Sequence, residues 1–274
     1  MFLKMKHMFH NVILIISICV LSCVFSACED RQAIIIAGST SVQPYAEVLA
    51  EEYMILNPEI IIDIQGGGSS AGIIAVESGT AAIGMSSRTL KDSEQYLWFF
   101  EMAKDGLAMI INPLNPVNSL TLAQIRDIYT GDIQNWSALG GANARIHIIA
   151  REEGSGTRSA FEDLVMDNRR ISPRAIVQDS NGTVRQLVAG DIYSIGFISL
   201  GLVDNTVKAL QLGGIPATQE NVLNGSYSLY RSFLFVTKEK PSEAAMGFLD
   251  FVFSVKGLMM MADEGLIPNY MERN

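Results

Sequence analysis

The chain has 274 residues, of which 49% are hydrophobic, so it is long and apolar enough to build two lobes of ordinary domain size. Its formal net charge of −9 argues against a general nucleic-acid binder, because that function needs a basic surface. The negative charge does not exclude a site for a small anion, since local N–H and O–H donors are sufficient to form one.

The N-terminus has the pattern of a targeting segment. Lys4 and Lys6 are followed by the uncharged, strongly apolar run Val12–Phe25, which is too short for a comfortable membrane span. Two small residues, Ser-Ala, then precede Cys28. This order resembles a bacterial lipoprotein signal, and it predicts that residues 1–27 are a signal peptide and that Cys28 carries lipid. An ordinary secreted protein, cut at the same place and with an unmodified cysteine, is the alternative.

Cysteine usage limits the chemistry of the body of the protein. All three cysteines lie in the leader or at its end, at positions 19, 23 and 28. The body is therefore expected to contain no disulfide and no thiolate metal site. No spacing of histidines and carboxylates suggests a catalytic zinc either, so neither a metal nor a cofactor is predicted.

The first part of the body alternates strands and helices. Val42–Leu56 is predicted as a helix, because its apolar side chains recur at steps of three and four. Pro44 falls in its first turn, where proline is tolerated, and Asn57-Pro58 ends it. The neighbouring elements are predicted as the strands Ala33–Ala37, Ile60–Ile64, Ala82–Met85 and Leu107–Ile111 and the helix Ile73–Glu77.

The second part begins at the turn-rich segment Asn112–Pro116, where we place a crossing between two lobes. Thr121 then begins a helix that runs to Tyr129, with Gln124 as its capping-box partner. The elements that follow are the strands Arg145–Ala150, Ala175–Gln178, Ser194–Ile198 and Leu229–Thr237, the helices Thr157–Val165 and Thr183–Val188, and a helix-rich tail from Pro241 to Gly265. This alternation predicts an α/β fold with mainly parallel sheets, in which ligands bind beyond the carboxyl ends of the strands.

Four short tracts of serine, threonine and glycine come directly after predicted strands. They are residues 37–41 (AGSTS), 66–72 (GGGSSAG), 85–88 (MSSR) and 151–158 (REEGSGTR). Three of them run into a helical pattern, and a helix start presents free N–H donors and the positive end of a dipole. An arginine beside such donors adds a planar, permanent positive charge. The tracts therefore predict a site for a small tetrahedral anion.

In order and spacing, these tracts resemble the substrate-binding component of the Pst-type phosphate ABC transporter. The resemblance covers nearly the whole body and includes Asp127–Gly131, Asn135-Trp136 and the tail Phe248–Pro268. It implies a two-lobed periplasmic-binding-protein-like fold (type II), in which a hinge closes an interlobe cleft around the anion.

The same resemblance implies how the chain is divided and what it does. The chain would cross between lobes twice, so that residues 30–111 plus 226–274 form the first lobe and residues 112–225 the second. The protein would capture inorganic phosphate and deliver it to the permease subunits and ATPase of an ABC transporter. It would work as a monomer, either lipid-anchored at the outer face of the cytoplasmic membrane or in the periplasm, with no nucleic-acid partner.

The resemblance also implies a set of phosphate ligands. They are Ser39, Thr40, Ser41, Ser69, Ser70, Ser87, Arg151, Ser155, Gly156 and Thr157. Well-known family members have an aspartate at the position of Ser87, and its carboxylate accepts a hydrogen bond from protonated phosphate. Without that acceptor we expect poorer discrimination against sulfate, unless Glu153 or Asp63 replaces it.

The tracts also have purely structural interpretations. Serine and threonine at 39–41 suit a helix cap, and the glycines at 66–68 suit a flexible turn. Arg88 fits equally a charge for the anion and a surface ion pair. The residues expected in packing or surface roles are Trp98, Trp136, His147, Glu152, Glu153 and Arg158.

Other functions stay open beside phosphate capture. Sulfate, molybdate or arsenate would suit the same donors, and a phosphate-responsive surface protein would suit the same scaffold. A serine hydrolase is disfavoured, because residues 153–157 lack the Gly-x-Ser-x-Gly frame and His147 is the only histidine in the body. No enzymatic activity is therefore predicted.

Overall fold

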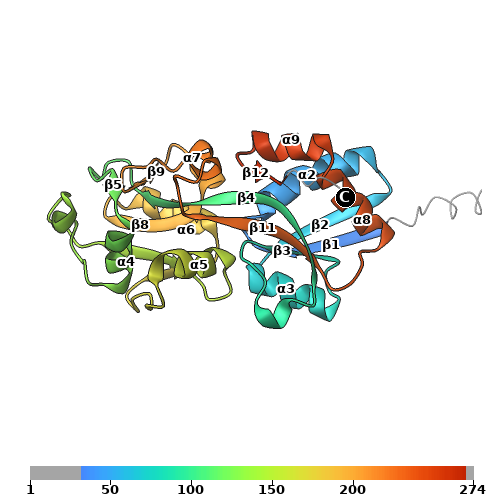
Figure 1. The fold of residues 1–274 in the computed structure, drawn as a ribbon, viewed down its shortest axis with the longest axis horizontal. Coiled ribbons are helices and arrows are strands. Elements are labelled where there is room, and N and C mark those ends of the chain that lie inside the picture. Colours follow the sequence, from blue (N-terminus) through green and yellow to red (C-terminus); the bar gives the residue numbers. More distant parts are fainter. Residues whose placement is uncertain (1–31, 270–274) are drawn as a thin grey trace, which may run out of the picture.

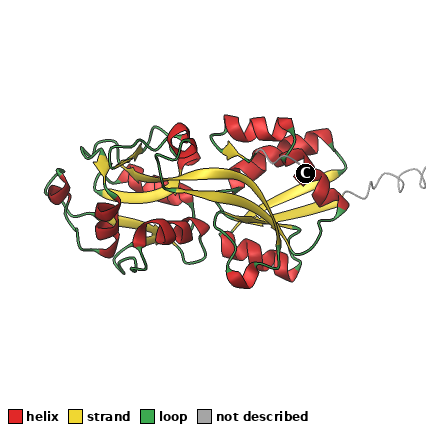
Figure 2. Ribbon diagram, viewed as in Figure 1, coloured by secondary structure: helices red, strands yellow, loops and turns green. Residues whose placement is uncertain are grey.

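The computed structural model describes residues 32–269, so the predicted signal peptide and Cys28 lie outside the described residues. One sheet runs along an elongated molecule, and helices pack on both sides of it (Figures 1 and 2). The strand order is β2-β1-β3-β11-β4-β8-β6-β7, with β12 and β9 each paired to β4. This arrangement confirms the α/β class.

The bounds of the predicted elements agree with the observed ones to within a few residues, except that β4 begins much earlier; several short strands and turns and one short helix were not predicted. Up to that strand the elements are β1 (Gln32–Gly38), α2 (Gln43–Leu56), β2 (Ile60–Gly66), α3 (Ser69–Ser78), β3 (Ile83–Ser86), the 3₁₀ turn η1 (Asp92–Glu94) and β4 (Trp98–Ile111). The elements that follow are β5 (Ser119–Leu120), α4 (Leu122–Thr130), η2 (Trp136–Leu139), β6 (His147–Arg151), α5 (Gly156–Phe161), the π-helical turn η3 (Glu162–Met166), β7 (Ile176–Gln178), α6 (Asn181–Gly190), β8 (Ser194–Ser199), η4 (Leu200–Leu202), β9 (Lys208–Ala209), β10 (Gln211–Leu212) and α7 (Gln219–Leu223). The last elements are β11 (Tyr230–Thr237), α8 (Glu243–Val252), α9 (Val255–Asp263) and β12 (Ile267–Pro268).

The two long strands β4 and β11 connect the halves of the molecule (Figure 1). They pair antiparallel with each other, and their register shifts between Phe233 and Leu234. One cluster of buried hydrophobic side chains contains Ala103 and Phe233, whereas a second contains Leu107 and Leu229. The change from one core to the other therefore falls inside both strands.

Two details of the predicted architecture need correction. The core changes before Leu107 rather than at Asn112–Pro116, because β4 continues through both halves as a single strand. The sheet is also mixed rather than mainly parallel. β1 pairs parallel with β2 and β3, and β6 with β7 and β8, but β11 runs antiparallel to β3 and β4, and β4 antiparallel to β8. Each of these antiparallel pairs contains β4 or β11, the two strands along which the chain passes between the halves in opposite directions.

Local sequence signals explain several helices. The predicted capping box of α4 is present, because Thr121 Oγ1 accepts from the N–H of Gln124 at 3.2 Å and Gln124 Oε1 accepts from the N–H of Thr121 at 2.8 Å. In α2, Tyr45, Leu49 and Tyr53 lie four residues apart and are buried on one face. Tyr53 packs edge-on against a ring of α8, with the centroids 5.6 Å apart.

The two tryptophans and the histidine that were expected to be structural differ in their burial and in their contacts. Trp136 is fully buried, and its Nε1 donates to the carbonyl of Tyr193 at 2.8 Å, as a packing residue should. Trp98 is 50% exposed at the start of β4, so the packing prediction is wrong for it. His147 Nδ1 lies 2.6 Å from a carboxylate oxygen of Asp191, which ties β6 to the turn before β8.

The C-terminal helices cover the first core. Phe248 and Leu249 of α8 and Met261 of α9 are buried in it. No single helix within residues 32–269 is long and apolar enough to cross a membrane; α8 and α9 together meet those criteria, but they are bent by 58°.

Candidate anion-binding site

Backbone hydrogen bonds join the three tracts of the first half at the carboxyl ends of β1, β2 and β3. The N–H of Ser39 donates to the carbonyl of Met85 at 2.9 Å, and the N–H groups of Gly67 and Gly68 donate to the carbonyl of Gly38 at 2.9 Å. Gly38 has a φ of +140°, and a Cβ there would lie 2.3 Å from the Met85 carbonyl oxygen. Only glycine allows this approach, which collects the tracts at one edge of the sheet.

Three hydroxyl groups from these tracts form one buried cluster. Ser39 Oγ donates to Ser87 Oγ at 2.8 Å, and Ser69 Oγ lies 3.4 Å from the same atom. The N–H of Ser87 donates to Ser69 Oγ at 3.0 Å. All three residues are 2% exposed or less. Because hydroxyls rotate, this dry cluster offers both donors and acceptors.

The fourth tract meets this cluster from the other half of the molecule. Thr157 Oγ1, in the first turn of α5, lies 2.7 Å from Ser41 Oγ, and both residues are buried. A Cβ on Gly156 would lie 2.2 Å from Ser69 Oγ and 2.6 Å from Ser87 Oγ. The missing side chain at Gly156 therefore lets the two halves approach each other here.

Two predicted ligands have other partners at this junction. Ser155 Oγ accepts from the N–H of Arg158 at 3.2 Å and so caps α5. The N–H of Ser70 donates to the carbonyl of Gly154 at 3.1 Å, which is another contact between the halves. Ser70 itself is half-buried, unlike the fully buried Ser69 beside it. Ser155 and Ser70 thus lie next to the cluster, where Ser155 caps a helix and Ser70 joins the two halves.

Arg151 is the buried cation of the fourth tract, and only 1% of it is exposed. Its Nη2 donates to Thr40 Oγ1 of the other half at 3.2 Å and to the carbonyl of Asp179 at 2.9 Å. Nε and Nη2 each lie 2.9 Å from a carboxylate oxygen of Glu152, so the expectation that Glu152 is only a surface residue is wrong. Arg151 Nη1 is buried and has no hydrogen-bond partner among residues 32–269.

Four further residues join the cluster that were not predicted. Asn181 Nδ2 donates to Ser41 Oγ at 2.9 Å, and Asn181 Oδ1 accepts from the N–H of Ser199 at 3.3 Å. Arg231 Nη2 donates to Ser41 Oγ at 3.1 Å and to Asp105 Oδ2 at the same distance. One signal was available in the sequence, because Arg231 is the one charge inside the run Leu229–Thr237.

The charges of this network influence one another. Burial raises the pKa of the Asp105 carboxyl, and Arg231 partly offsets that effect. Burial lowers the pKa of the Arg231 guanidinium; Asp105 opposes the shift, whereas the like charge of Arg151 adds to it. Arg151 and Arg231 thus bring two like charges to this network, and a bound anion would offset their repulsion.

The remaining candidates lie outside the cluster. Arg88 is buried, and its Nη1 and Nη2 donate to the two oxygens of Glu94 at 2.7 and 2.9 Å, so its charge serves an ion pair. Asp63 and Glu153, the suggested replacements for the missing acceptor, are both exposed. The buried carboxylate linked to the hydroxyls through Arg231 is that of Asp105, and both of its oxygens already accept hydrogen bonds.

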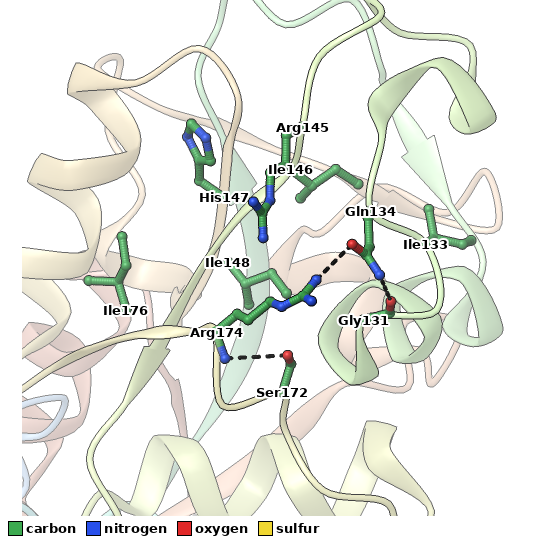
Figure 3. A pocket seen from close by; sticks show the side chains of 10 residues that line it. All are labelled: Gly131, Ile133, Gln134, Arg145, Ile146, His147, Ile148, Ser172, Arg174 and Ile176. Atoms are coloured by element: carbon green, nitrogen blue, oxygen red, sulfur yellow. Dashed lines mark hydrogen bonds between the residues drawn. The ribbon is translucent and has the colours of Figure 1, made fainter.

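A pocket of about 150 Å³ lies beside β6, away from the four tracts. Figure 3 shows the guanidinium groups of Arg145 and Arg174 within it, and Arg174 Nη1 donates to Gln134 Oε1 at 2.8 Å. His147 lines this pocket. Its Nδ1 pairs with Asp191, whereas Ser155 Oγ accepts from the N–H of Arg158. The described residues also hold no group of three histidine, cysteine or carboxylate side chains able to bind a metal ion.

Comparisons with known proteins point to one family. The model of the PBP superfamily domain matches residues 26–256. The phosphate-binding protein PstS of Bacillus subtilis (strain 168) is 31% identical, over 85% of this chain and 79% of its own length. A protein from Clostridium perfringens, crystallised with phosphate bound and described as a phosphate ABC transporter substrate-binding protein, is 43% identical with a TM-score of 0.85, over 87% of this chain and all of its own. An ABC-type phosphate transport receptor from Vibrio cholerae is 38% identical with a TM-score of 0.73, over 86% of this chain and all of its own.

Proposed function

The chain belongs to the PstS family of phosphate-binding proteins within the PBP superfamily, and we propose that it captures inorganic phosphate between its two halves. The observation that carries this proposal is the position of Arg151. Its guanidinium donates across the junction to Thr40 and keeps a buried Nη1 without a partner in the described part of the chain. A buried unpaired donor is unfavourable, and a phosphate oxygen is an acceptor that guanidinium groups bind well.

The proposed phosphate ligands are those that meet at the junction. They are the hydroxyls of Ser39, Thr40, Ser41, Ser69, Ser87 and Thr157, the guanidinium of Arg151 and the amide of Gly156, with Ser70 and Ser155 beside them. Micromolar affinity requires about −8 kcal/mol. Hydrogen bonds to a charged group contribute about 1.5–3 kcal/mol each, so a few of these groups are sufficient once desolvation is included.

Capture would proceed by closure of two lobes. We take the two hydrophobic cores as the centres of these lobes and the paired strands β4 and β11 as the hinge. The contacts of Ser41 with Thr157, and of Thr40 with Arg151, join the lobes in the closed form. Phosphate that contacts both lobes would favour this form over an open one.

The proposal includes an anchor and a transport partner. Cys28 precedes the start of β1 at Gln32 by only a few residues, so a lipid on Cys28 would hold the first lobe against the outer face of the cytoplasmic membrane. The closed protein would deliver phosphate, as a monomer, to the permease subunits and ATPase of an ABC transporter. Fractionation of cells that express Cys28→Ala tests the anchor: the variant should leave the membrane fraction, and its retention there would contradict lipidation.

Calorimetric titration of the purified protein tests the binding function. Phosphate should bind with micromolar or tighter affinity, and scattering should show a more compact molecule with phosphate present. Sulfate, molybdate and arsenate are titrated in parallel, since Ser87 stands where relatives carry an acceptor. If one of these anions binds more tightly than phosphate, that anion and not phosphate is the ligand. Absence of binding by all four would contradict the proposal.

A further inference from the structure

Arg231 lies where the chain passes from one half of the molecule to the other. It is on β11, directly opposite Asp105 on β4, between the residues that belong to the two cores. Arg231 is 6% exposed and Asp105 is 2% exposed. A buried ion pair of this kind seldom stabilises a fold more than well-packed apolar side chains would, so its presence calls for another reason.

The hydrogen bonds of Asp105 fix the guanidinium of Arg231 in one orientation. Oδ2 of Asp105 accepts from Nε at 3.2 Å and from Nη2 at 3.1 Å, and Oδ1 accepts from Ser199 Oγ at 2.7 Å. On its other side, the guanidinium carbon lies 5.3 Å from the centroid of the Phe233 ring. The remaining nitrogen, Nη1, is buried and lacks a partner among the residues described. Arg231 therefore keeps one buried donor group that is unpaired among the described residues.

The orientation of Arg231 directs it to the candidate anion site. Its Nη2 donates to Ser41 Oγ, which also meets Thr157 Oγ1 at 2.7 Å and Asn181 Nδ2 at 2.9 Å. Arg231 thus bonds directly to Ser41 of the first half and is one further hydrogen bond from Thr157 and Asn181 of the second half. The guanidinium of Arg151, the other buried cation with an unpartnered Nη1, is near enough to lower the pKa of Arg231.

We propose that Arg231 is a second anion-binding guanidinium, positioned by Asp105 at the hinge, and that the site selects a doubly charged tetrahedral oxyanion. This inference rests on the proposed function and extends it to the charge of the ligand. The guanidinium of Arg231 and the amide nitrogen of Asn181 are donors to Ser41, the neighbouring hydroxyls can donate or accept, and the buried carboxylate of Asp105 has both oxygens occupied. A ligand oxygen that still carries a proton would find, among the described residues there, only hydroxyl oxygens and no free buried carboxylate to accept it, whereas a dianion can accept charge-assisted hydrogen bonds from both guanidinium groups.

Calorimetry with phosphate and with sulfate, at about pH 6 and about pH 8, tests this assignment because phosphate loses its second proton over that range. For the wild-type protein, phosphate affinity should rise with pH and sulfate should bind at both values. Arg231→Gln should weaken both anions by roughly tenfold or more. The matched control is Arg185→Gln, since Arg185 pairs with Asp204 at the surface of the second half, and it should bind as the wild type does.

A second variant separates binding from folding. In Arg231→Met with Asp105→Leu, both charges are removed together, so no unpaired ion stays buried and the melting temperature should be close to that of the wild type. The same loss of affinity in this folded variant supports the proposal. Unchanged affinity in both Arg231 variants would overturn the role of Arg231 alone. Failure of the wild-type protein to bind phosphate and sulfate would instead overturn the proposed function together with this extension.

Discussion

The hydroxyl groups of Ser41 and Thr157 lie 2.7 Å apart, although the residues are separated by 116 positions in the sequence. Ser41 precedes α2 in the first half, and Thr157 lies in the first turn of α5 in the second. Both residues are buried, so their contact lies inside the junction between the two halves.

Removing one hydroxyl of this pair should weaken anion binding. Thr157→Val keeps the shape of the side chain but removes the donor and leaves Ser41 with one partner fewer. Phosphate affinity measured by calorimetry should fall by roughly three- to tenfold, which corresponds to one hydrogen bond of about 1 kcal/mol. Thr80→Val is the matched control, because Thr80 is exposed beyond α3. Equal losses in the two variants would contradict the proposed site.

Arg151 should contribute more to binding than any single hydroxyl, because it brings a buried charge. Arg151→Ala should weaken phosphate binding by roughly tenfold or more. Arg126→Ala is the control, since Arg126 instead binds the carbonyl of Val165 and Asp167. Calorimetry that finds unchanged affinity for Arg151→Ala would remove this arginine from the site.

The close approach at Gly156 should not tolerate a side chain. In Gly156→Ala the new Cβ would meet Ser69 Oγ at 2.2 Å and Ser87 Oγ at 2.6 Å, so the closed form must open slightly or rearrange its hydroxyls. Phosphate affinity should therefore fall, by roughly tenfold. Gly190→Ala, at the end of α6, has no atom within 4 Å of the new Cβ and should bind normally. Wild-type affinity in Gly156→Ala would show that the halves do not need this contact.

Stability in acid should depend on the Arg88–Glu94 pair. Hydrogen bonds from Arg88 lower the pKa of Glu94 in the folded state despite its partial burial. A folded pKa below the unfolded one means that the pair stabilises the protein above the unfolded pKa, about 4.3, and that this contribution is lost as the pH falls through the folded pKa.

The variant Glu94→Gln tests this pH dependence. It should reduce the free energy of unfolding by about 1–3 kcal/mol at neutral pH, and the difference from the wild type should shrink in acid. Denaturant titrations at several pH values measure it, with the exposed Glu239→Gln as the control. A difference that is independent of pH would mean that charge is not the cause.

Ser87 should set the selectivity between phosphate and sulfate. Ser87→Asp would place an acceptor next to Ser39 and Ser69, which both lie within hydrogen-bond distance of Ser87 Oγ. Sulfate has no proton to donate to that carboxylate, so its ability to compete with phosphate should decrease. Ser78→Asp, at the exposed end of α3, should leave competition unchanged. Undiminished competition by sulfate in Ser87→Asp would contradict this role of Ser87.

The parts of the fold that could be predicted are those determined by neighbours in sequence. The Thr121–Gln124 capping box is local, and so is the spacing of Tyr45 and Leu49 along α2. The start of β4 was missed because residues 98–106 mix charges such as Asp105 with exposed aromatic residues such as Trp98. Such a stretch has no clear alternation of apolar and polar side chains.

The site was predictable only in part, for a similar reason. The serine tracts can be recognised by their composition. The pairing of Arg231 with Asp105 instead depends on the register of two strands, and the two residues are 126 positions apart in sequence. Neither residue has a local motif around it. Asn181 resembles any residue that follows the cap of a helix, and only the fold reveals that its amide reaches Ser41.

The pairing of β4 with β11 limits how the molecule can open. Both links between the halves belong to one antiparallel ladder, so neither can slide or lengthen without breaking hydrogen bonds of the other. Torsion of the two-stranded ribbon is the less demanding motion, and the shifted register after Phe233 is a natural place for it. The two halves would then rotate about the β4–β11 ribbon. Their ligand-binding faces would still point toward each other in the empty protein, so that closure on a new ligand would need only the reverse rotation.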